Sequence, residues 1–545
     1  MKAEIEKIGS VVRSGFAVAT WFIGCVCTLM VPLMGGHFAG FGVGVLLWLG
    51  WFGFVFWWTW KKGIFELIPG WGSDSDTLRG TEIYSTAQAL QYIKKNKLED
   101  VCSARIGEIP IPESVETTHF LMAGATGSGK SLAFIQLLDS ARDRGHRAVV
   151  ADLGGEFVKR YYRDGKDLIL CPFDARTKAW SPFAEMRQSF DAARIAASMI
   201  PEGSGESREW NGYARAVLEG ILERCFENDI ATNESLVYYC LGADTSELRE
   251  LCQGTPAAVY FVQGNERQLG SIRGILASYI KPLTYLKPEA GKGRGFSIRN
   301  WVEAGGDTWL FLPFKKDQID SIRSMLAAQI DTVATAILST DSQLDRRLWI
   351  ALDEFPQLGE IKQLEPLLSL GRKYGVCAIL GMQAITQPAM VFGRERAQSI
   401  LASLGTWTVF RQGDAESAEY MSKFLGDEEI RRMVSGTSQG KDSRSQSESE
   451  QIVRQRAIMP GELQQLGARV AIVNVAGPMP PAVTEIPLPT DRPGQEKVLA
   501  LDESVPARAM AVRAPAGLLT KAPPTAAPAP KIGQQTPPPQ LEIKL

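Results

Sequence analysis

The sequence predicts an α/β protein in which an open sheet core is interrupted by an all-α domain and preceded by two apolar helices. Three observations lead to this prediction. Short apolar runs that end in glycine or in acidic residues alternate with helical segments, as they do in open parallel sheets. The stretch 185–299 between these runs has helical periodicity only. The run between Arg13 and Lys61 contains no formal charge, and the whole length of 545 residues fits about two to four structural units.

Composition and charge narrow the class of protein. The formal net charge of −2 does not predict a polyanion partner, so a nucleic-acid role has to rest on a local patch or a pore lining. The eight cysteines are scattered without a CxxC pair, which favours reduced thiols in the cytosol over a disulfide framework. The three histidines, His37, His119 and His146, form no metal-ligand pattern.

Residues 1–62 are predicted to form a membrane anchor. The charge-free run is about 47 residues long, and one helix that spans a lipid bilayer needs about 20. Two spans near 14–34 and 39–60 fit, joined by the turn sequence MGGHFAG. Basic residues flank both outer ends and are missing from the turn, so the positive-inside rule places both termini in the cytoplasm. The alternatives are a signal peptide, for which the apolar region is too long, and a buried core hairpin.

A glycine-rich loop follows the apolar run THFLMA and leads into a helical segment that ends at Gly145. The loop matches the phosphate-binding pattern G-x4-G-K-[ST] with Gly124, Ala125, Thr126, Gly127, Ser128, Gly129, Lys130 and Ser131. Its backbone N–H groups and the N-terminus of the helix suit a phosphate. We expect Lys130 to reach the β- and γ-phosphates of ATP and Ser131 to ligate Mg²⁺. A structural glycine-rich turn is the alternative.

The second half of such a site should be an apolar strand that ends in acid. The sequence RRLWIALDEFPQLG at 346–359 contains a short apolar strand, 348–352, followed by Asp353 and Glu354. Ligands bind at the carboxyl ends of the strands in an open α/β sheet. We expect Asp353 to hold Mg²⁺ and Glu354 to act as the general base on the attacking water, because the metal needs only the aspartate. A surface acidic pair is the alternative.

A third apolar run, GVCAILGMQ at 375–383, ends in Gln383. In phosphate-loop motors with a catalytic glutamate beside the aspartate, such a strand lies between the other two, so Gln383 is the expected sensor of the γ-phosphate. Gln387 is the nearby competitor, and a capping or solvent-facing glutamine is the alternative. The sequence ADLGGEF is a further strand-then-acid run, which places Asp152 and Glu156 near the site without assigning them a role.

A basic pair precedes this third run in the sequence SLGRKYG. In a ring, Arg372 could reach the nucleotide of a neighbouring subunit as an arginine finger. The competitors are Arg394, Arg396 and Arg411, and a solvated surface arginine is equally compatible with the sequence.

The distance along the chain between Ser131 and Asp353 exceeds what a minimal phosphate-loop core needs, which indicates an insertion. An all-α domain is predicted at 185–299, so the nucleotide-binding core comprises 63–184 and 300–477. A wide apolar stripe on one helix supports the helical reading, with Trp210, Tyr213, Ala214, Val217, Leu218, Ile221, Leu222, Cys225 and Phe226 at helical spacing. Strand-like sequence returns at DTWLFLPF.

Two further segments are predicted to lack regular structure. The polar, serine-rich stretch 435–451 is interpreted as a mobile loop within the folded body, since strand-like sequence resumes at ARVAIVNVAG. The tail 478–545 is rich in proline and alanine and is expected to be disordered, either as a spacer or as a partner-binding segment.

The ordered set of these motifs resembles a known family. A two-helix anchor, GATGSGKS, a helical insertion, LDEFPQLG, GRKYG and GMQAITQ occur in the same order in the type IV secretion coupling proteins of the TraD/TrwB kind, relatives of the FtsK-like DNA motors. The similarity covers roughly residues 10–480. The phosphate loop alone is generic, whereas the whole ordered set is specific.

The resemblance implies a RecA-like P-loop ATPase core that assembles into a homo-hexamer at the bacterial inner membrane. Such a ring receives a relaxase bound to single-stranded DNA and passes the strand to the type IV secretion channel. The family's arginine finger and sensor glutamine fall at Arg372 and Gln383, its phosphate-loop lysine at Lys130. Two alternatives remain, an FtsK-like translocase for duplex DNA and a nucleotide-switched membrane receptor that docks cargo without pumping.

Overall fold

The structure is a computed structural model that describes residues 77–98, 104–203, 205–262, 264–286, 295–439 and 444–492, together with residues 494, 512 and 514. The chain divides into two compact units at Asp76, and all of these residues belong to the second unit, Thr77–Leu545. The predicted anchor of residues 1–62 lies outside the described residues. Within the described ranges, no helix is both long and apolar enough to cross a bilayer.

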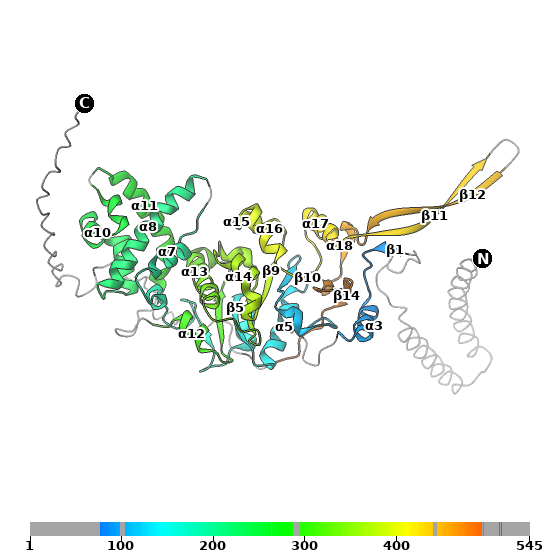
Figure 1. Cartoon of the computed structure of the whole chain (residues 1–545), viewed down its shortest axis with the longest axis horizontal. Helices are drawn as coiled ribbons and strands as arrows, with labels where there is room; N and C mark the ends of the chain where they lie inside the picture. Colours follow the sequence, from blue (N-terminus) through cyan, green and yellow to red (C-terminus); the bar gives the residue numbers. More distant parts are fainter. Residues whose placement is uncertain are drawn as a thin grey trace, which may run out of the picture. The chain divides into compact units, whose positions relative to one another are not determined.

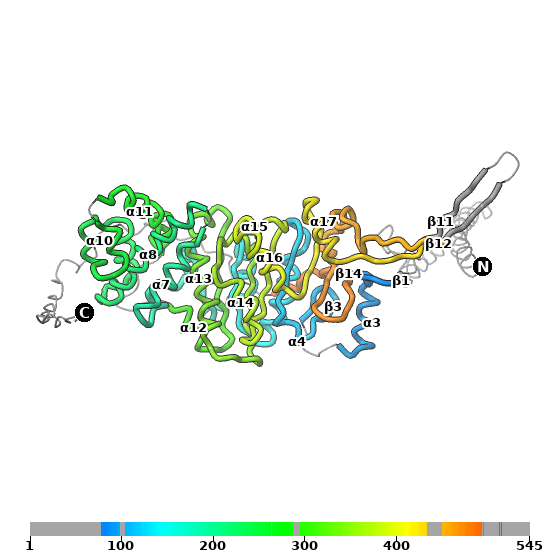
Figure 2. Tube along the Cα trace, turned by 45° about the horizontal axis from the view of Figure 1, so that its top comes forward, coloured from blue at the N-terminus to red at the C-terminus, as the bar shows by residue number. Residues whose placement is uncertain are grey.

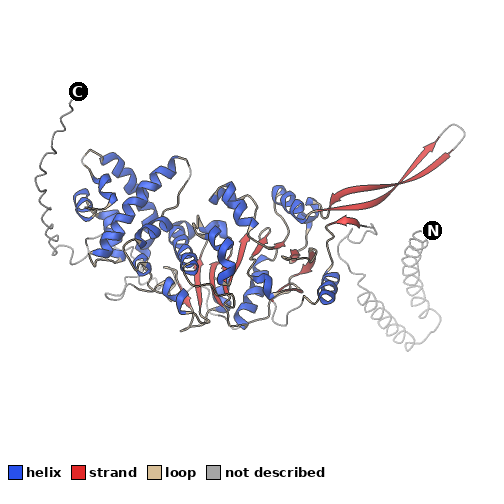
Figure 3. Ribbon diagram, viewed as in Figure 1, coloured by secondary structure: helices blue, strands red, loops and turns tan. Residues whose placement is uncertain are grey.

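A nine-stranded sheet forms the centre of the described body, in the order β14-β13-β10-β4-β9-β8-β5-β7-β6 (Figures 1 and 3). The strands from β10 to β6 in this order are parallel, and β13 and β14 add an antiparallel edge. The bounds are β4 Phe120–Ala123, β5 Arg147–Leu153, β6 Leu168–Ile169, β7 Trp309–Phe314, β8 Leu348–Leu352, β9 Val376–Met382, β10 Thr406–Val409, β13 Val470–Asn474 and β14 Ala482–Glu485.

Helices cover both faces of this sheet, which explains why β4, β8 and β9 at its centre are apolar and buried at every position. Phe120 and Met122 of β4 pack in one core cluster with Phe134 of α5, and Leu121 between them points to the other face because side chains alternate along a strand. On that other face α14 contacts β9 and α13. The helices outside the insertion are α3 Thr86–Asn96, α4 Glu113–Glu116, α5 Lys130–Asp143, α6 Glu156–Tyr161, α12 Ile298–Ala304, α13 Ile319–Leu338, α14 Leu364–Leu370, α15 Gln387–Phe392, α16 Arg394–Ala402, α17 Ala415–Leu425 and α18 Pro460–Gln465.

Every regular element among the described residues from 181 to 286 is helical, as the periodicity predicts. Figure 2 shows α8, α10 and α11 grouped together, and α8 contacts both other helices. The middle of the predicted stripe on α8, including Val217 and Ile221, is fully buried, while Trp210 at its start is half-buried. The helices are α7 Asp191–Met199, α8 Glu206–Glu227, α9 Asn233–Val237, α10 Thr245–Leu251 and α11 Glu266–Ile280, with shorter helical turns at Pro182–Glu185, Tyr238–Gly242, Pro256–Phe261 and Lys281–Tyr285.

The buried carboxylate of Glu185 joins the start of this helical insertion to its end. One oxygen accepts hydrogen bonds from the Trp180 indole at 3.0 Å and from the Ile298 backbone N–H at 2.7 Å. The other accepts from the Ser297 hydroxyl at 3.1 Å and from the Arg299 backbone N–H at 3.0 Å. The carboxylate therefore satisfies the free N–H groups at the first turn of α12 and fixes that helix against the entry segment.

The stretch 435–451 was predicted to be a mobile loop, but its described residues, 435–439 and 444–451, lie in the two strands of a long antiparallel hairpin, so this prediction was wrong. The hairpin consists of β11, Asp427–Gln439, and β12, Arg444–Arg456, and β1, Thr77–Gly80, pairs with the base of β11. The polar sequence led to the wrong prediction because it lacks the apolar face that usually marks a strand. The hairpin is instead supported by backbone pairing and by cross-strand ion pairs such as Arg431–Glu450.

The tail predicted at 478–545 starts too early, because the sheet continues beyond residue 478. Strand β14 pairs with β13 in antiparallel register, and its Ala482 and Thr484 side chains are buried. Ile486 after it is buried as well. The prolines of the sequence GPMPPA before the strand hid it, because proline-rich sequence is typical of linkers.

Gly375 between α14 and β9 sits in a conformation and an environment that other residues do not tolerate. Its φ of +70° is in the left-handed region, and a Cβ atom there would lie 1.8 Å from the Arg346 carbonyl oxygen. We expect Gly375→Ala to lower the free energy of unfolding by about 3 kcal/mol, from backbone strain plus a forced displacement of the Arg346 backbone. Gly165→Ala is the control, since Gly165 has a φ of +73° and no atom within 4 Å of its would-be Cβ. Equal losses in urea unfolding of the two variants would contradict the steric argument.

His119 enters β4 as a buried neutral imidazole. Its Nδ1 accepts the Ala378 N–H at 3.2 Å, so the proton is on Nε2, which donates to the Leu368 carbonyl at 2.9 Å. Burial lowers the pKa of His119 from 6.5 to about 4. Because the folded-state pKa lies below the unfolded one, this contribution to stability is complete above pH 6.5 and is lost as the pH falls toward 4.

The variant His119→Asn removes this titration while keeping a residue that tolerates the φ of +67° at this position. We expect the difference in unfolding free energy between the unmodified chain and the variant to shrink by about 2 kcal/mol between pH 7.5 and pH 5. Urea unfolding at both pH values measures it, and the other titrating groups cancel because both proteins share them. A difference that stays constant with pH would show that His119 does not titrate in this way.

Candidate active site

The predicted site residues meet at the carboxyl ends of three neighbouring parallel strands. The phosphate loop begins at Gly124 directly after β4, Asp353 follows β8, and Gln383 follows β9. Strand β9 lies between β4 and β8, as the interpretation of the GVCAILGMQ run required. The Gly124 N–H donates to the Met382 carbonyl at 3.2 Å, which holds the start of the loop beside the end of β9.

The phosphate loop is held by backbone contacts from two other segments. The Ala125 N–H donates to the Arg411 carbonyl at 2.8 Å, and the Ser128 carbonyl accepts from the Arg469 N–H at 2.9 Å. Gly129 has a φ of +115° and is followed at once by α5, whose first N–H groups have no partner within the helix. The loop and the N-terminus of α5 therefore present backbone N–H donors in the arrangement that binds phosphate.

Lys130 links the loop to the acidic pair. Its Nζ donates to the Gly124 carbonyl at 2.6 Å and to the Ala125 carbonyl at 3.3 Å, and it lies 3.6 Å from Glu354 Oε1. Burial lowers the pKa of Lys130, and the nearby charges of Glu354 and Asp353 oppose this shift. The Lys130 ammonium is thus a buried positive charge that lies between the phosphate loop and the two carboxylates.

The acidic pair is buried and strained. Burial, and next the charge of Glu354, raise the pKa of Asp353 to about 7. Glu354 has a φ of +56°, a conformation that costs a non-glycine residue on the order of 1–3 kcal/mol and that clusters at functional sites. Gly381 on β9 leaves room for the pair, because a Cβ atom there would lie 3.3 Å from Asp353 Oδ1 and from the Glu354 nitrogen.

Several buried polar atoms around the N-terminus of α5 have no hydrogen-bond partner among the described residues, namely Ser128 Oγ, Asp152 Oδ1, Glu354 Oε2 and Gln412 Oε1. Buried polar groups are almost always paired in folded proteins, so such a cluster fits a ligand or ordered water. Hydroxyl and carboxylate oxygens are also what Mg²⁺ prefers. Ser131, half-buried on the first turn of α5, and Asp353 therefore fit the proposed metal with a bound nucleotide.

Asp152 stands at the end of β5, between β8 and β7, and is fully buried. Its Oδ2 accepts the Val158 N–H at 2.8 Å, which fixes the first turn of α6. Burial raises its pKa to about 7, and the backbone hydrogen bond from Val158 opposes the shift. The sequence ADLGGEF predicted that Asp152 lies near the site but assigned it no role.

Gln412 was missed in the sequence, although it lies directly behind the phosphate loop. Its Nε2 donates to the Phe410 carbonyl at 2.6 Å and to the Ala123 carbonyl at 3.2 Å, so it bridges the ends of β10 and β4. No sequence signal pointed to it, because the pairing of β10 with β4 joins segments almost three hundred residues apart.

The structure places the two remaining candidates, Gln383 and Arg372, at opposite edges of the sheet. Gln383 lies at the same edge as the phosphate loop, and its competitor Gln387 caps the turn, with its side-chain oxygen accepting the N–H groups of Gln383 and Ala384. Arg372 is exposed and precedes β9, so it lies at the opposite edge of the sheet, about 20 Å from the loop of its own subunit. Arg411, a competitor as the arginine finger, lies two residues after the end of β10, at the nucleotide edge.

Comparisons with known proteins agree with this geometry. Residues 103–488 match the family described as the type IV secretion-system coupling protein DNA-binding domain. The coupling protein TraD of Escherichia coli (strain K12) is 28% identical over 414 residues, which cover 75% of this chain and 58% of TraD, less than two thirds of its length. The conjugal transfer protein TraG of Rhizobium radiobacter is 27% identical over 210 residues, 38% of this chain and 33% of TraG.

Solved structures of the bacterial conjugative coupling protein TrwB are similar over nearly their whole length. An unbound form that lacks an N-terminal segment has a TM-score of 0.70 and 31% identity, and the match covers 78% of this chain and 97% of that one. TrwB in complex with ADP and Mg²⁺ also has a TM-score of 0.70 and 31% identity, over 79% and 99% of the two chains. Because the family match spans both halves of the nucleotide site, this chain belongs to the type IV secretion-system coupling proteins.

Proposed function

We propose that the chain is the coupling ATPase of a bacterial conjugation or type IV secretion system. It recruits a relaxase bound to single-stranded DNA and uses ATP hydrolysis to drive transfer into the secretion channel. The observation that carries this proposal is the 3.6 Å contact between Lys130 and Glu354, which joins the phosphate loop to the acidic pair at one sheet edge. The match to coupling proteins such as TraD supports the cargo and the setting.

ATP and Mg²⁺ are the proposed cofactors, and the solved complexes of TrwB with ADP and Mg²⁺ and with a non-hydrolysable ATP analogue support them. The loop of residues 124–131 would bind the phosphates, with Lys130 on the β- and γ-phosphates, and Ser131 and Asp353 would hold the ion. Bound Mg²⁺ supplies neutralisation of phosphate charge. Glu354, through its unpartnered Oε2, would orient the attacking water and accept its proton.

A homo-hexameric ring is proposed because Arg372, the proposed arginine finger, would have to reach the nucleotide of another subunit. Gln383 is the proposed sensor of the γ-phosphate, and its position beside Gly124 supports that role. Arg372 is the proposed arginine finger for the nucleotide of the neighbouring subunit, since it is exposed and far from its own loop. The predicted anchor in residues 1–62 would tether the ring to the inner membrane.

Mixing two inactive variants tests the shared site. Lys130→Ala and Arg372→Ala should each lose ATP hydrolysis as pure preparations. A mixture should regain activity, because a Lys130→Ala subunit still offers Arg372 to the intact loop of an Arg372→Ala neighbour. The measurement is ATP turnover over a range of mixing ratios at constant total protein, with Arg208→Ala replacing Arg372→Ala in the control mixture. A mixture without any recovery would rule out Arg372 as the finger in trans.

The proposed cargo is tested by ATP turnover of the full-length chain with single-stranded DNA, with duplex DNA and without DNA, at low salt. We expect single-stranded DNA to give the largest stimulation. A larger response to the duplex would favour the duplex translocase. An equal rate in all three conditions, at high protein concentration, would favour the docking receptor and reject the motor.

A further inference from the structure

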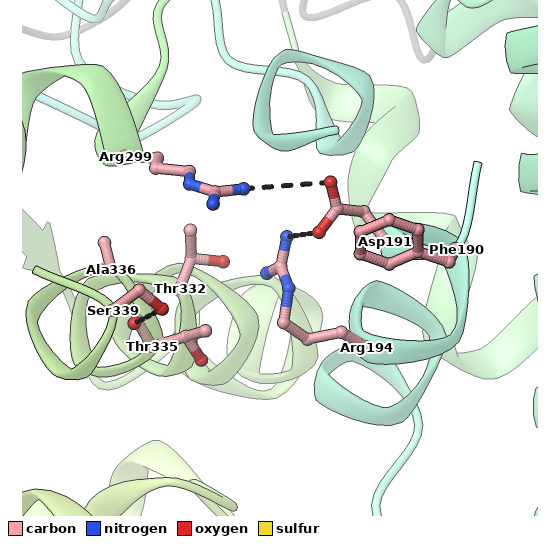
Figure 4. A pocket seen from close by; sticks show the side chains of 8 residues that line it. All are labelled: Phe190, Asp191, Arg194, Arg299, Thr332, Thr335, Ala336 and Ser339. Carbon is pink, nitrogen blue, oxygen red and sulfur yellow. Dashed lines mark hydrogen bonds and ion pairs between the residues drawn. The ribbon is translucent and has the colours of Figure 1, made fainter. Parts of the chain in front are cut away.

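A cavity that is lined by two arginines lies at the junction between the helical insertion and the core, and it contains no residue of the nucleotide site. Its volume is about 220 Å³, and its walls come from the start of α7, from α12 and from the second half of α13 (Figure 4). That volume has room for several water molecules or for one phosphate group.

Two arginines face each other across this cavity (Figure 4). The guanidinium of Arg299 is 3.7 Å from the nearest oxygens of both Asp191 and Glu303, beyond hydrogen-bond length. One nitrogen of Arg194 donates to the Glu185 carbonyl at 3.0 Å and to Asp191 Oδ1 at 3.3 Å. Since a guanidinium has five N–H donors, both side chains keep donors for a further acceptor.

The opposite wall of the cavity comes from α13. The Thr332 hydroxyl donates to the Ala328 carbonyl at 2.7 Å, and the Ser339 hydroxyl donates to the Thr335 carbonyl at 2.8 Å. Thr335 Oγ1 is buried within the wall and has no hydrogen-bond partner among the described residues. The donors that remain for a ligand with acceptor oxygens are therefore those of the two guanidinium groups.

Asp191 positions the arginines without cancelling their charge. Its Oδ2 accepts the backbone N–H groups of Arg187 at 2.8 Å and of Gln188 at 3.2 Å, so part of its negative charge is met by the backbone. Among the residues that line the cavity, two guanidinium groups stand against one carboxylate, while Glu303, 3.7 Å from Arg299, lies outside the lining. The cavity is therefore suited to an anion.

The Phe190 side chain indicates which class of anion the cavity would bind. It lines the same cavity, yet 76% of its surface is exposed, at the residue before α7. Binding of a free phosphate would not involve an exposed aromatic ring. Single-stranded nucleic acids, in contrast, are bound by basic side chains that contact the phosphate backbone and by aromatic rings that stack on the bases.

We propose that this cavity binds one phosphodiester group of a single-stranded nucleic acid, with Arg194 and Arg299 on the phosphate and Phe190 stacked on an adjacent base. The inference rests on the proposed function for its cargo and adds a contact site on the insertion. The proposed contact would hold the nucleic-acid strand at the place where the insertion packs against α13, a helix of the nucleotide-binding core.

The test measures binding of a fluorescent oligo-dT strand, and of an abasic phosphodiester strand of equal length, to the full-length chain. Phe190→Ala should weaken oligo-dT binding about tenfold and leave abasic binding unchanged. Arg299→Gln should weaken both and reduce the slope of log affinity against log salt by about 0.7, the value for one phosphate contact on a single strand. Met390→Ala, at an 82% exposed residue on α15, and Arg208→Gln, which removes an arginine from the same insertion, are the matched controls.

The outcomes separate the subsite from the proposed function. Binding by the unmodified chain with Phe190→Ala and Arg299→Gln indistinguishable from their controls would overturn the subsite alone. Inorganic phosphate that protects Arg299 from dicarbonyl modification, together with no effect of Phe190→Ala, would mark a free-phosphate site and also overturn the proposal. Failure of the unmodified chain to bind either strand would reject the DNA motor itself.

Discussion

We expect Glu354→Gln to lower the rate of ATP hydrolysis by about a hundredfold to a thousandfold and to leave nucleotide affinity within about threefold of the unmodified chain. The amide has the shape of the carboxylate, but it cannot accept a proton from water. The different surroundings of the two Glu354 carboxylate oxygens explain why hydrolysis is lost while nucleotide affinity is kept. Oε1 faces Lys130 Nζ at 3.6 Å, while Oε2 is buried, has no partner among the described residues and is the oxygen proposed to accept the proton.

Single-turnover hydrolysis and nucleotide binding by fluorescence are the measurements for this variant. Glu156→Gln is the matched control, because it removes a negative charge at the exposed start of α6, near Asp353, without altering the residue that faces the lysine. A hydrolysis rate in Glu354→Gln equal to that of the control would remove Glu354 as the base. Continued DNA transfer without turnover would favour the docking receptor.

Lys130→Ala has the second large effect, a loss of nucleotide affinity of about a hundredfold together with loss of hydrolysis. The lysine is 7% exposed and already bonded to the loop carbonyls of Gly124 and Ala125, so its ammonium is held where the phosphates bind. Truncation removes the buried positive charge that the phosphates would meet and leaves two carboxylates in its place.

Isothermal titration with ADP and with a non-hydrolysable ATP analogue measures this loss. Lys159→Ala, on the exposed side of α6, is the control for a simple change in net charge. We expect the loss to be larger for the triphosphate analogue, because the proposed role of Lys130 includes a contact with the γ-phosphate. Equal affinities in Lys130→Ala and the control would mean that the loop does not bind the nucleotide.

Local sequence patterns predicted the parts of the site that depend on neighbouring residues. The loop from Gly124 to Ser131 and the acidic pair after Leu352 each combine an apolar strand with the turn that follows it. Their meeting point follows from the rule that parallel strands end at one sheet edge. The RecA-like core is thereby predictable, and its likeness to TrwB supports that.

The remaining parts depend on contacts between distant segments. Gln412 reaches the site because β10 pairs with β4, and nothing in the sequence RQGD indicates that pairing. The hairpin of β11 and β12 has no alternating apolar face, and its register is supported by pairs such as Arg454 with Asp427. Strand β14 is recognisable only once β13 is in place to pair with it.

The pairing of β1 with β11 gives the chain a defined path for mechanical load. Thr77–Gly80 is the first described element after the predicted anchor, and its hydrogen bonds to β11 run across the direction of a pull along the strand. From β11 the chain leads back through α17 to Arg411, whose carbonyl holds the Ala125 N–H of the phosphate loop at 2.8 Å. In the proposed anchored ring, tension along β1 would be carried in shear by this four-residue strand and would reach the nucleotide pocket through α17.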